Sequence, residues 1–179
     1  ASSTGLLCVH TVRKGYFIRA VHDLEGRNII DVLATRAGYL VACSADRVPS
    51  LSSSSSSSSD KNSTAWKYDV HLFWANGQHL KSVSTATCIK TMVVNGPGDV
   101  LICGSEEGIL TLLVLNSLEF VCEYDLSLHG AISALWFTED QQFLLAGSAD
   151  GTFTVLTDPE IRWRILQTQL AKTPLLGAL

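Results

Sequence analysis

Positive charge is scarce in this sequence. Its 179 residues include 13 lysines and arginines against 17 aspartates and glutamates, for a formal net charge of −4. The densest basic groups are Arg13-Lys14 and the pair Arg162 and Arg164. A protein that binds nucleic acid or an anionic membrane surface needs a concentrated basic patch. We therefore expect no nucleic-acid partner and no direct electrostatic attachment to a membrane.

Long hydrophobic runs are also missing. The longest apolar stretch, Ile109 to Leu115, is interrupted by Thr111 and is far shorter than a membrane span. The first residues show no cationic segment followed by an apolar one, so no signal peptide is visible. Apolar residues nevertheless make up 46% of the chain. Spread over many short runs, they can fill a substantial core.

Metal-binding and catalytic motifs are absent. The five cysteines are far apart and form no C-x-x-C pair, which is typical of reduced, buried thiols in a reducing compartment. The five histidines are dispersed, and neither G-x-S-x-G nor H-E-x-x-H occurs. Gly104-Ser105 and Gly147-Ser148 stand at corresponding positions of a repeat, so packing explains them better than nucleophilic chemistry. We expect no enzyme, no catalytic residue, no cofactor and no metal.

One short pattern occurs three times with a drifting sequence. It covers Tyr39–Asp46, Val100–Gly108 and Phe143–Gly151. Ser105 and Ser148 lie 43 positions apart, within the roughly 40–45 residues of a WD40 propeller blade. Ser44 precedes Ser105 by 61 positions, and removing an insertion of about 18 residues restores the period, as expected when insertions fall in surface loops. The repeat predicts a binding scaffold.

Short apolar strands separated by polar turns fill each repeat, with no convincing helix. Four antiparallel strands per repeat make a propeller blade, so the predicted fold is an all-β, WD40-type β-propeller of about three and a half four-stranded blades. The expected segments are the end of a preceding blade (1–27), three blades (28–86, 87–127 and 128–170) and a C-terminal tail (171–179). A closed propeller typically has about 4–8 blades. We therefore expect the rest of its own propeller as a partner of this chain.

An insertion interrupts the first complete blade between residues 47 and 65. It contains eight consecutive serines, Ser52–Ser59. A serine tract cannot bury apolar area, so we expect a disordered loop. The loop is either an arm regulated by phosphorylation or a surface loop that tolerates insertions and whose sequence has drifted neutrally.

The stretch from Leu128 to Gly151 resembles a WD40 repeat. His129 stands in the place of the family's Gly-His, Ser148 in that of its strand serine, and Asp150 in that of its turn aspartate. In the family these side chains form a buried hydrogen-bonded network with a tryptophan. Leu156-Thr157 replaces the usual Trp-Asp here, so the resemblance implies an incomplete network.

The whole chain resembles the C-terminal WD40 region of BEACH-domain, neurobeachin-like proteins. The similar stretches are Val9–Val12 followed by Gly15–Val21, then Val70–Gly77, and finally Asp158–Trp163. The resemblance implies a non-catalytic protein-interaction scaffold that acts in vesicle trafficking and membrane-protein sorting. It also implies an upstream BEACH domain as partner, and a cytoplasmic location with indirect, peripheral membrane association. The alternatives are a small WD40 adaptor or substrate receptor unrelated to BEACH proteins and, more remotely, a propeller enzyme.

Turns at one end of the blades supply the candidate site. In a propeller, the turns after the second strand and before the first strand of each blade line one rim. That places six residues near one face: Asp46, Arg47, Glu106, Glu107, His129 and Asp150. The hypothesis is an acidic rim that receives a basic or polar peptide. The alternative is that these turns are simply hydrophilic.

Overall fold

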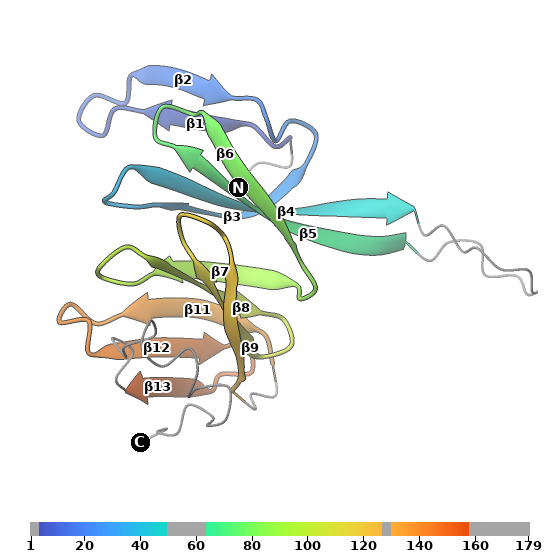
Figure 1. The fold of residues 1–179 in the computed structure, drawn as a ribbon, viewed down its shortest axis with the longest axis vertical. Helices are drawn as coiled ribbons and strands as arrows, with labels where there is room; N and C mark the ends of the chain where they lie inside the picture. The colour runs from blue at the N-terminus through green and yellow to red at the C-terminus, as the bar shows by residue number, and fades with distance from the viewer. Residues whose placement is uncertain (1–3, 50–63, 127–129, 158–179) are drawn as a thin grey trace, which may run out of the picture.

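A computed structural model describes residues 4–49, 64–126 and 130–157 of the chain, which contain thirteen β-strands. These described residues include no helix, and hence none long and apolar enough to cross a membrane. Every sheet is antiparallel, with its strands in chain order (Figure 1). The first sheet is a hairpin of β1 (Leu7–His10) and β2 (Phe17–Val21).

The second and third sheets have four strands each. The second contains β3 (Asn28–Ala34), β4 (Tyr39–Pro49), β5 (Thr64–Trp74) and β6 (His79–Thr85). The third contains β7 (Ile89–Val94), β8 (Val100–Ser105), β9 (Ile109–Val114) and β10 (Phe120–Asp125). The fourth sheet contains β11 (Ile132–Phe137), β12 (Phe143–Ser148) and β13 (Phe153–Thr157). The fourth strand expected over Arg162–Leu170 lies outside the described residues, as does the tail, 171–179.

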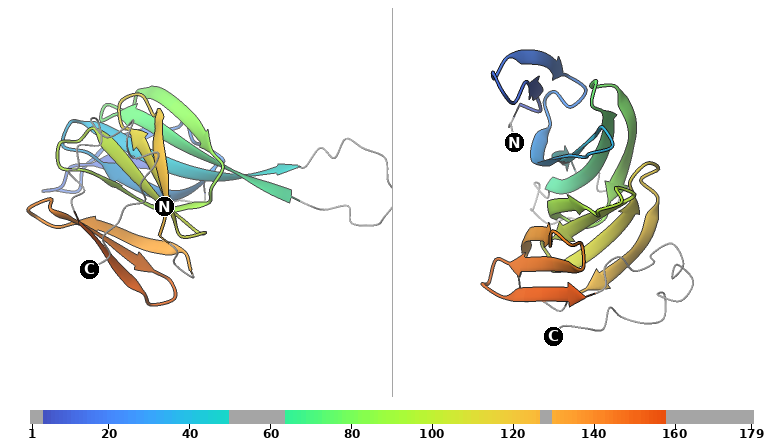
Figure 2. Two further views of the ribbon diagram at one scale, coloured as in Figure 1. Left: turned by 60° about the horizontal axis from the view of Figure 1, so that its bottom comes forward. Right: turned by 90° about the vertical axis from the view of Figure 1, so that its left-hand side faces the viewer.

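The sheets follow one another along an arc (Figure 2), and the first strands of the second, third and fourth sheets lie side by side. β3 contacts β7, and β7 contacts β11. A hydrogen bond joins the first two of these sheets, because the Met92 N–H donates to Oδ2 of Asp31 at 2.8 Å. Radial stacking of meander sheets around their first strands is the architecture of a β-propeller. The chain is an all-β, partial propeller.

Apolar clusters between neighbouring sheets hold the stack together. The cluster between the second and third sheets includes Val41, Leu72 and Leu101, all fully buried. The cluster between the third and fourth sheets includes Ile102 and Ile132. Every residue of β8 is buried because a sheet covers each of its faces. A fully buried strand reads as a continuous apolar run, which explains the apolar sequence of Val100–Cys103.

The expected loop begins later than the sequence suggested. Residues 47–49 and 64–65 belong to β4 and β5, which pair as far as Pro49 and Thr64. The neighbouring strands stop earlier, at the pairs Asn28–Ala45 and Thr85–Tyr68. β4 and β5 therefore continue beyond the sheet as a two-stranded ribbon, which leaves the body of the molecule in Figure 1. The serine tract starts only beyond this ribbon and lies outside the described residues.

The cysteines are all free thiols, and most are sheltered. Cys43, Cys88 and Cys103 are buried, and Cys122 is half-buried. Burial raises the pKa of the Cys43 thiol to about 12 and also raises that of Cys103. The expectation of buried thiols is wrong for Cys8, which is exposed on the short β1–β2 hairpin.

Candidate functional site

The structure brings the described candidate residues to one end of the three larger sheets. Glu106 and Glu107 lie in the β8–β9 turn and Asp150 in the β12–β13 turn. Asp46 and Arg47 are at the corresponding end of the second sheet, but they lie in β4 and not in a turn. We call this end, with these five residues, the rim. His129 lies outside the described residues.

The β8–β9 turn is rigidly built. The Ser105 hydroxyl accepts the N–H groups of Glu107 (3.2 Å) and Ile109 (3.1 Å), and the Glu106 N–H donates to the Cys88 carbonyl at 2.8 Å. The Glu106 carboxylate pairs with Lys90 Nζ at 3.1 Å. Contacts with the Cys88 thiol and with Lys90 hold the pKa of Glu106 below its usual range. Glu107 is exposed and has no ion-pair partner among the described residues, so this turn carries excess negative charge.

The second sheet's part of the rim is not acidic, because cations compensate its carboxylates. Arg27 Nη1 donates to Asp69 Oδ2 at 3.1 Å and forms an ion pair with Asp46 Oδ2 at 3.2 Å. Lys67 Nζ reaches the same Asp69 oxygen at 3.0 Å. Burial opposes ionisation of Asp69, but hydrogen bonds from Ser84 and Lys67 outweigh it and lower the carboxyl pKa. A pattern of turn residues could not reveal this compensation, since Arg27 precedes β3 and is far from Asp69 in sequence.

The base of the ribbon presents a cation above an aromatic ring. The Arg47 guanidinium carbon lies 5.0 Å from the centroid of the Trp66 ring. Trp66 is 46% exposed although it is a large apolar side chain. Such a pair combines flat apolar area with positive charge. Beside the compensated carboxylates, it makes this part of the rim basic and aromatic in character.

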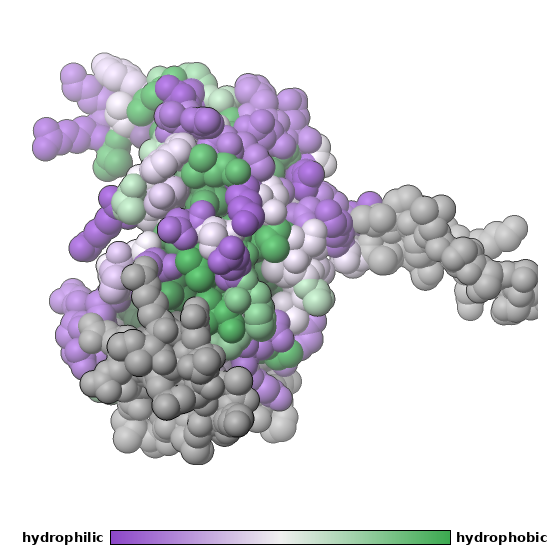
Figure 3. All heavy atoms as spheres, viewed as in Figure 1, coloured by the Kyte–Doolittle hydropathy of each residue, from purple (hydrophilic) through white to green (hydrophobic). Residues whose placement is uncertain are grey.

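Asp150 serves mainly to close its own turn. Its Oδ1 accepts the N–H of Thr152 at 2.8 Å and the Thr152 hydroxyl at 2.7 Å. Aspartate side chains commonly stabilise turns by accepting from the backbone two residues on. Hydrophilic residues gather at both ends of the sheets in Figure 3, with a hydrophobic band between them. Polarity alone therefore does not distinguish the rim from the opposite end.

A chain of polar side chains crosses the second sheet, from the buried Ser44 and His71 to the exposed Ser82 and His79, and no sequence pattern predicted it. His71 Nε2 lies 3.0 Å from the Ser44 hydroxyl, and His71 Nδ1 lies 2.7 Å from the Ser82 hydroxyl. His79 Nε2 contacts the same Ser82 oxygen at 2.7 Å. Burial lowers the pKa of His71 to about 4, so its ring is neutral. Ser44 belongs to the repeated pattern, but its partner comes from the next strand, where His71 stands amid apolar residues and gives no motif.

This chain of side chains borders a small cavity of about 190 Å³, which Asp23, Leu24 and Arg27 also line. Serine hydroxyls occupy both ring nitrogens of His71. A general base in a catalytic triad needs one nitrogen for the nucleophile and an orienting acceptor, commonly a carboxylate, on the other. The arrangement instead satisfies buried polar atoms. In the parts of the chain that the structure describes, no three His, Cys, Asp or Glu residues are grouped to hold a metal ion.

Comparison with known proteins finds a relative by sequence and similar folds among solved structures. No model of a protein family matches the chain. BEACH domain-containing protein B of Arabidopsis thaliana is 26% identical over 157 residues, which cover 86% of this chain and 5% of that protein. The computationally designed Ika8 protein superposes with a TM-score of 0.60 at 16% identity, over 88% of this chain and 41% of Ika8. For the designed Ika4 protein the TM-score is 0.57 at 15% identity, over 87% of this chain and 81% of Ika4.

The fold thus defines a class of protein, the partial β-propeller. Within that class, the sequence is similar to part of a BEACH domain-containing protein, and the chain spans only 5% of the length of that relative.

Proposed function

We propose that the chain is a protein-interaction scaffold, the WD40 propeller part of a BEACH-type protein, and that it is not an enzyme. The similarity to a BEACH domain-containing protein, which extends over 86% of this chain, supports the assignment. The observation that carries the scaffold role is the rim, where charged side chains gather at one end of the sheets, on the hydrogen-bonded β8–β9 turn and on β4 at the base of the ribbon. Rigid turns with exposed charges suit partner recognition, because little ordering is needed on binding.

The rim offers two different surfaces to a partner. Glu106 and the unpaired Glu107 provide negative charge on the third sheet. Arg47 and Trp66 provide a cation and an aromatic face on the ribbon of the second sheet. We infer that a bound polypeptide places basic or polar residues against the β8–β9 turn, with acidic or aromatic residues toward the ribbon.

Charge reversal on the β8–β9 turn tests this proposal. In the full-length protein, proximity labelling of neighbours is compared between the wild type, Glu106→Lys with Glu107→Lys, and the matched control Glu119→Lys. Glu119 is also an exposed acid of the third sheet, but it lies in the β9–β10 turn at the opposite end. We expect the double variant to lose at least one neighbour by about tenfold while the control keeps all of them. Equal labelling in all three proteins contradicts the rim as a docking site.

The rest of a propeller is the second partner that we propose. In the third sheet, the face toward the fourth sheet carries Val100, Ile102, Leu110 and Leu112, all buried beneath the fourth sheet. The corresponding positions of the fourth sheet, one repeat later, are again all apolar: Phe143, Leu145, Phe153 and Val155. Phe153 is 64% exposed, and Trp136, at the position that corresponds to Val93, is 69% exposed. We infer that a further blade covers this face.

Vesicle trafficking, membrane-protein sorting and a cytoplasmic, peripherally membrane-associated location form the finer part of the proposal, and they rest on the BEACH resemblance. The test is the size and membrane fractionation of the endogenous protein, detected with an antibody against this segment. A membrane-associated band many times larger than one propeller is expected. A band of one propeller's size would favour the small adaptor or substrate receptor instead.

A further inference from the structure

The polar side chains that cross the second sheet alternate between serine and histidine. Ser44 of β4, His71 of β5, and Ser82 and His79 of β6 follow one another at distances of 3.0, 2.7 and 2.7 Å. We call these four residues the serine–histidine chain. Its inner end, Ser44 and His71, is buried, whereas Ser82 and His79 are exposed. The serine–histidine chain therefore connects the interior of the sheet with the surface.

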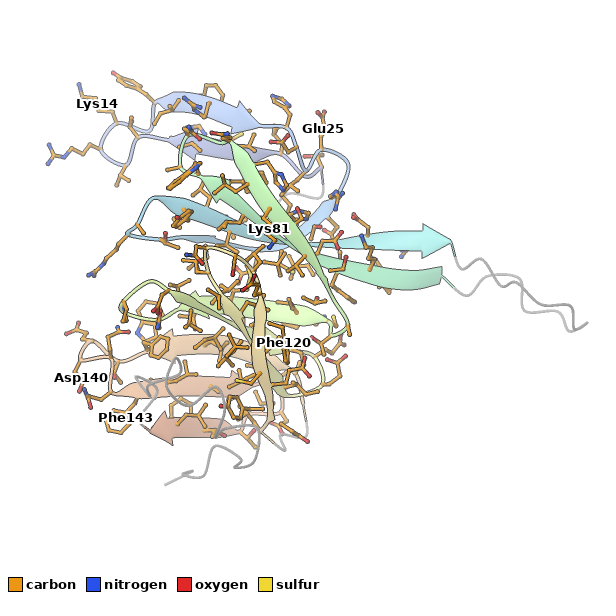
Figure 4. All side chains as sticks on the ribbon, viewed as in Figure 1. Lys14, Glu25, Lys81, Phe120, Asp140 and Phe143 are labelled. Carbon is orange, nitrogen blue, oxygen red and sulfur yellow. The ribbon has the colours of Figure 1, made fainter. Side chains whose placement is uncertain are left out.

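The two ends of the serine–histidine chain lie in different places. Ser82 and His79 border the cavity of about 190 Å³ beside the β2–β3 connection. Figure 4 shows Lys81, the neighbour of Ser82, on β6, and Glu25 on that connection. The inner end, Ser44, lies two residues before Asp46, where β4 reaches the rim. The side chains thus lead from the cavity to the base of the rim.

The Ser82 hydroxyl restricts how protons are arranged on the two rings. His71 Nδ1 and His79 Nε2 each lie 2.7 Å from its oxygen. A hydroxyl has one proton to donate, so at least one of these two nitrogens carries a proton and donates to Ser82. A neutral imidazole has one N–H and one acceptor nitrogen. The position of the proton on His71 therefore depends on the proton at His79 Nε2.

His71 stays neutral when His79 is charged. Burial, followed by the positive charge of Arg27, lowers the pKa of His71 to about 4, and a charge on His79 lowers it further. The two ring centroids are 6.2 Å apart. His71 therefore responds to a charge on His79 by a change of tautomer, in which its single proton moves from one ring nitrogen to the other.

Charged groups from the elements around the cavity do not bond to either ring. These groups are Arg19 on β2, Asp23 and Arg27 on the β2–β3 connection, Lys67 and Asp69 on β5, and Lys81 on β6. Arg27 and Lys67 pair with Asp69, and Arg19 donates to the Asn76 carbonyl. Among the described residues, the hydrogen-bond partners of the two rings are the hydroxyls of Ser44 and Ser82. Ser82 is therefore the hydrogen-bonded link between His71 and His79.

We propose that the serine–histidine chain is a proton-operated switch, in which protonation of His79 sets the tautomer of the buried His71. Protonated His79 donates from Nε2 to Ser82, and Ser82 donates to His71 Nδ1. His71 then carries its proton on Nε2 and donates to Ser44. An N–H of His71 aimed at Ser82 would instead face the positive ring of His79, which disfavours it.

Loss of the proton from His79 removes this bias. His79 Nε2 can then accept, which permits the opposite order, from Ser44 through His71 to Ser82. Hydrogen bonds that point the same way along a chain strengthen one another, so the two orders are the favoured states. Histidine is the side chain suited to such a device, because its charge changes near physiological pH. The switch does not require partner binding at the rim.

NMR of the full 179-residue polypeptide, labelled with nitrogen-15 at its five histidines, tests the proposal. The chemical shift of each ring nitrogen distinguishes an N–H from a bare nitrogen. Spectra recorded between pH 8 and 5.5 follow the charge of His79 and the tautomer of His71 together. As His79 is protonated, we expect the ratio of the Nε2–H form to the Nδ1–H form of His71 to rise by about tenfold or more. Both changes should have the same midpoint.

Three variants show whether the change passes through Ser82. Ser82→Ala removes the shared hydroxyl at an exposed position, and His79→Gln removes the titrating ring, so each should hold the His71 ratio constant. Ser84→Ala is the matched control, since it removes an exposed hydroxyl of the same strand that donates to Asp69, and it should behave like the wild type. A constant His71 tautomer in the wild type, or a change that persists in Ser82→Ala, would overturn the proposal.

Discussion

At the scale of single residues, the three repeated serines occupy the same position of the repeat but differ in the hydrogen bonds of their hydroxyl groups. Ser44 bonds to His71 of the adjacent strand, whereas Ser105 accepts two backbone N–H groups of its own turn. The Ser148 hydroxyl is buried with no hydrogen-bond partner among the described residues. A repeat can preserve a residue type while its partner changes, because a hydroxyl both donates and accepts.

The buried imidazole of His71 makes stability depend on pH. Its pKa falls from 6.5 to about 4 on burial, so below pH 6.5 the unfolded chain takes up a proton that the folded chain does not. The stability that this adds is complete above pH 6.5 and is lost progressively between pH 6.5 and 4. We expect the urea midpoint of unfolding to fall over that interval.

His71→Gln is the comparison for this prediction, because an amide can bond both serines but does not titrate in this range. We expect a lower midpoint at pH 7.5 and a flatter profile between pH 6.5 and 4. The lowered pKa of Asp69 acts below its ordinary 3.8, so that carboxyl does not account for the same interval. Parallel profiles for the wild type and the variant would refute the assignment to His71.

At the scale of elements, the β4–β5 ribbon is the strand pair that departs most from the expected blade. Its pairing from Asp46–Lys67 to Pro49–Thr64 continues without support from β3 or β6. Isolated two-stranded ribbons are marginal in water. Pairing within the ribbon and the contact between Arg47 and Trp66 are the described interactions that hold it.

Replacing residues 50–63 by the dipeptide Asn-Gly tests that account. A two-residue Asn-Gly turn suits a hairpin. A shorter connection also lowers the entropic cost of bringing the two ends of the loop together on folding. We expect an unchanged fold and a free energy of unfolding that is equal or greater by up to about 2 kcal/mol. Chemical denaturation measures it, with a Gly/Ser linker of the original length as control. A loss of more than about 1 kcal/mol would show that residues 50–63 contribute packing.

At the scale of the whole molecule, the outward face of the fourth sheet determines how the chain behaves in solution. Trp136 and Phe153 expose more than half of their surface on a sheet face that is otherwise apolar. Large contiguous apolar patches mark interaction surfaces or lead to aggregation. Repeat proteins obtain much of their stability from contacts between neighbouring repeats, and among residues 4–49, 64–126 and 130–157 this face has no such neighbour.

We expect the 179-residue chain to self-associate through this face. Replacing Trp136 and Phe153 by serine should weaken self-association by at least about tenfold, because each aromatic ring brings about 150–250 Å² of burial to an interface. Sedimentation velocity over a concentration series measures the change. Phe120→Ser, at a similarly exposed ring on β10, is the matched control and should leave association unaltered. A monomeric wild type would contradict the prediction.

Strands with a strong local pattern could be predicted from the sequence. Ile89–Val94 is found as expected in β7, and Val100–Gly104 lies within β8. The rim could be predicted in part, because repeat spacing places Glu107 and Asp150 at the same end of their sheets. The pairing of Asp46 and Asp69 with Arg27 could not, since it depends on strand register and on a residue outside the repeated pattern.

The sequence by itself determined the all-β class and the repeated unit, because apolar alternation and turn residues act over a few neighbouring positions. Only the tertiary structure decided what those units bring together. The neutral His71, the Ser82 hydroxyl that it shares with His79 and the compensated carboxylates around Arg27 all depend on side chains from different strands or connections. Burial, charge compensation and a shared hydroxyl are properties of three-dimensional neighbours, and short-range sequence patterns do not encode them.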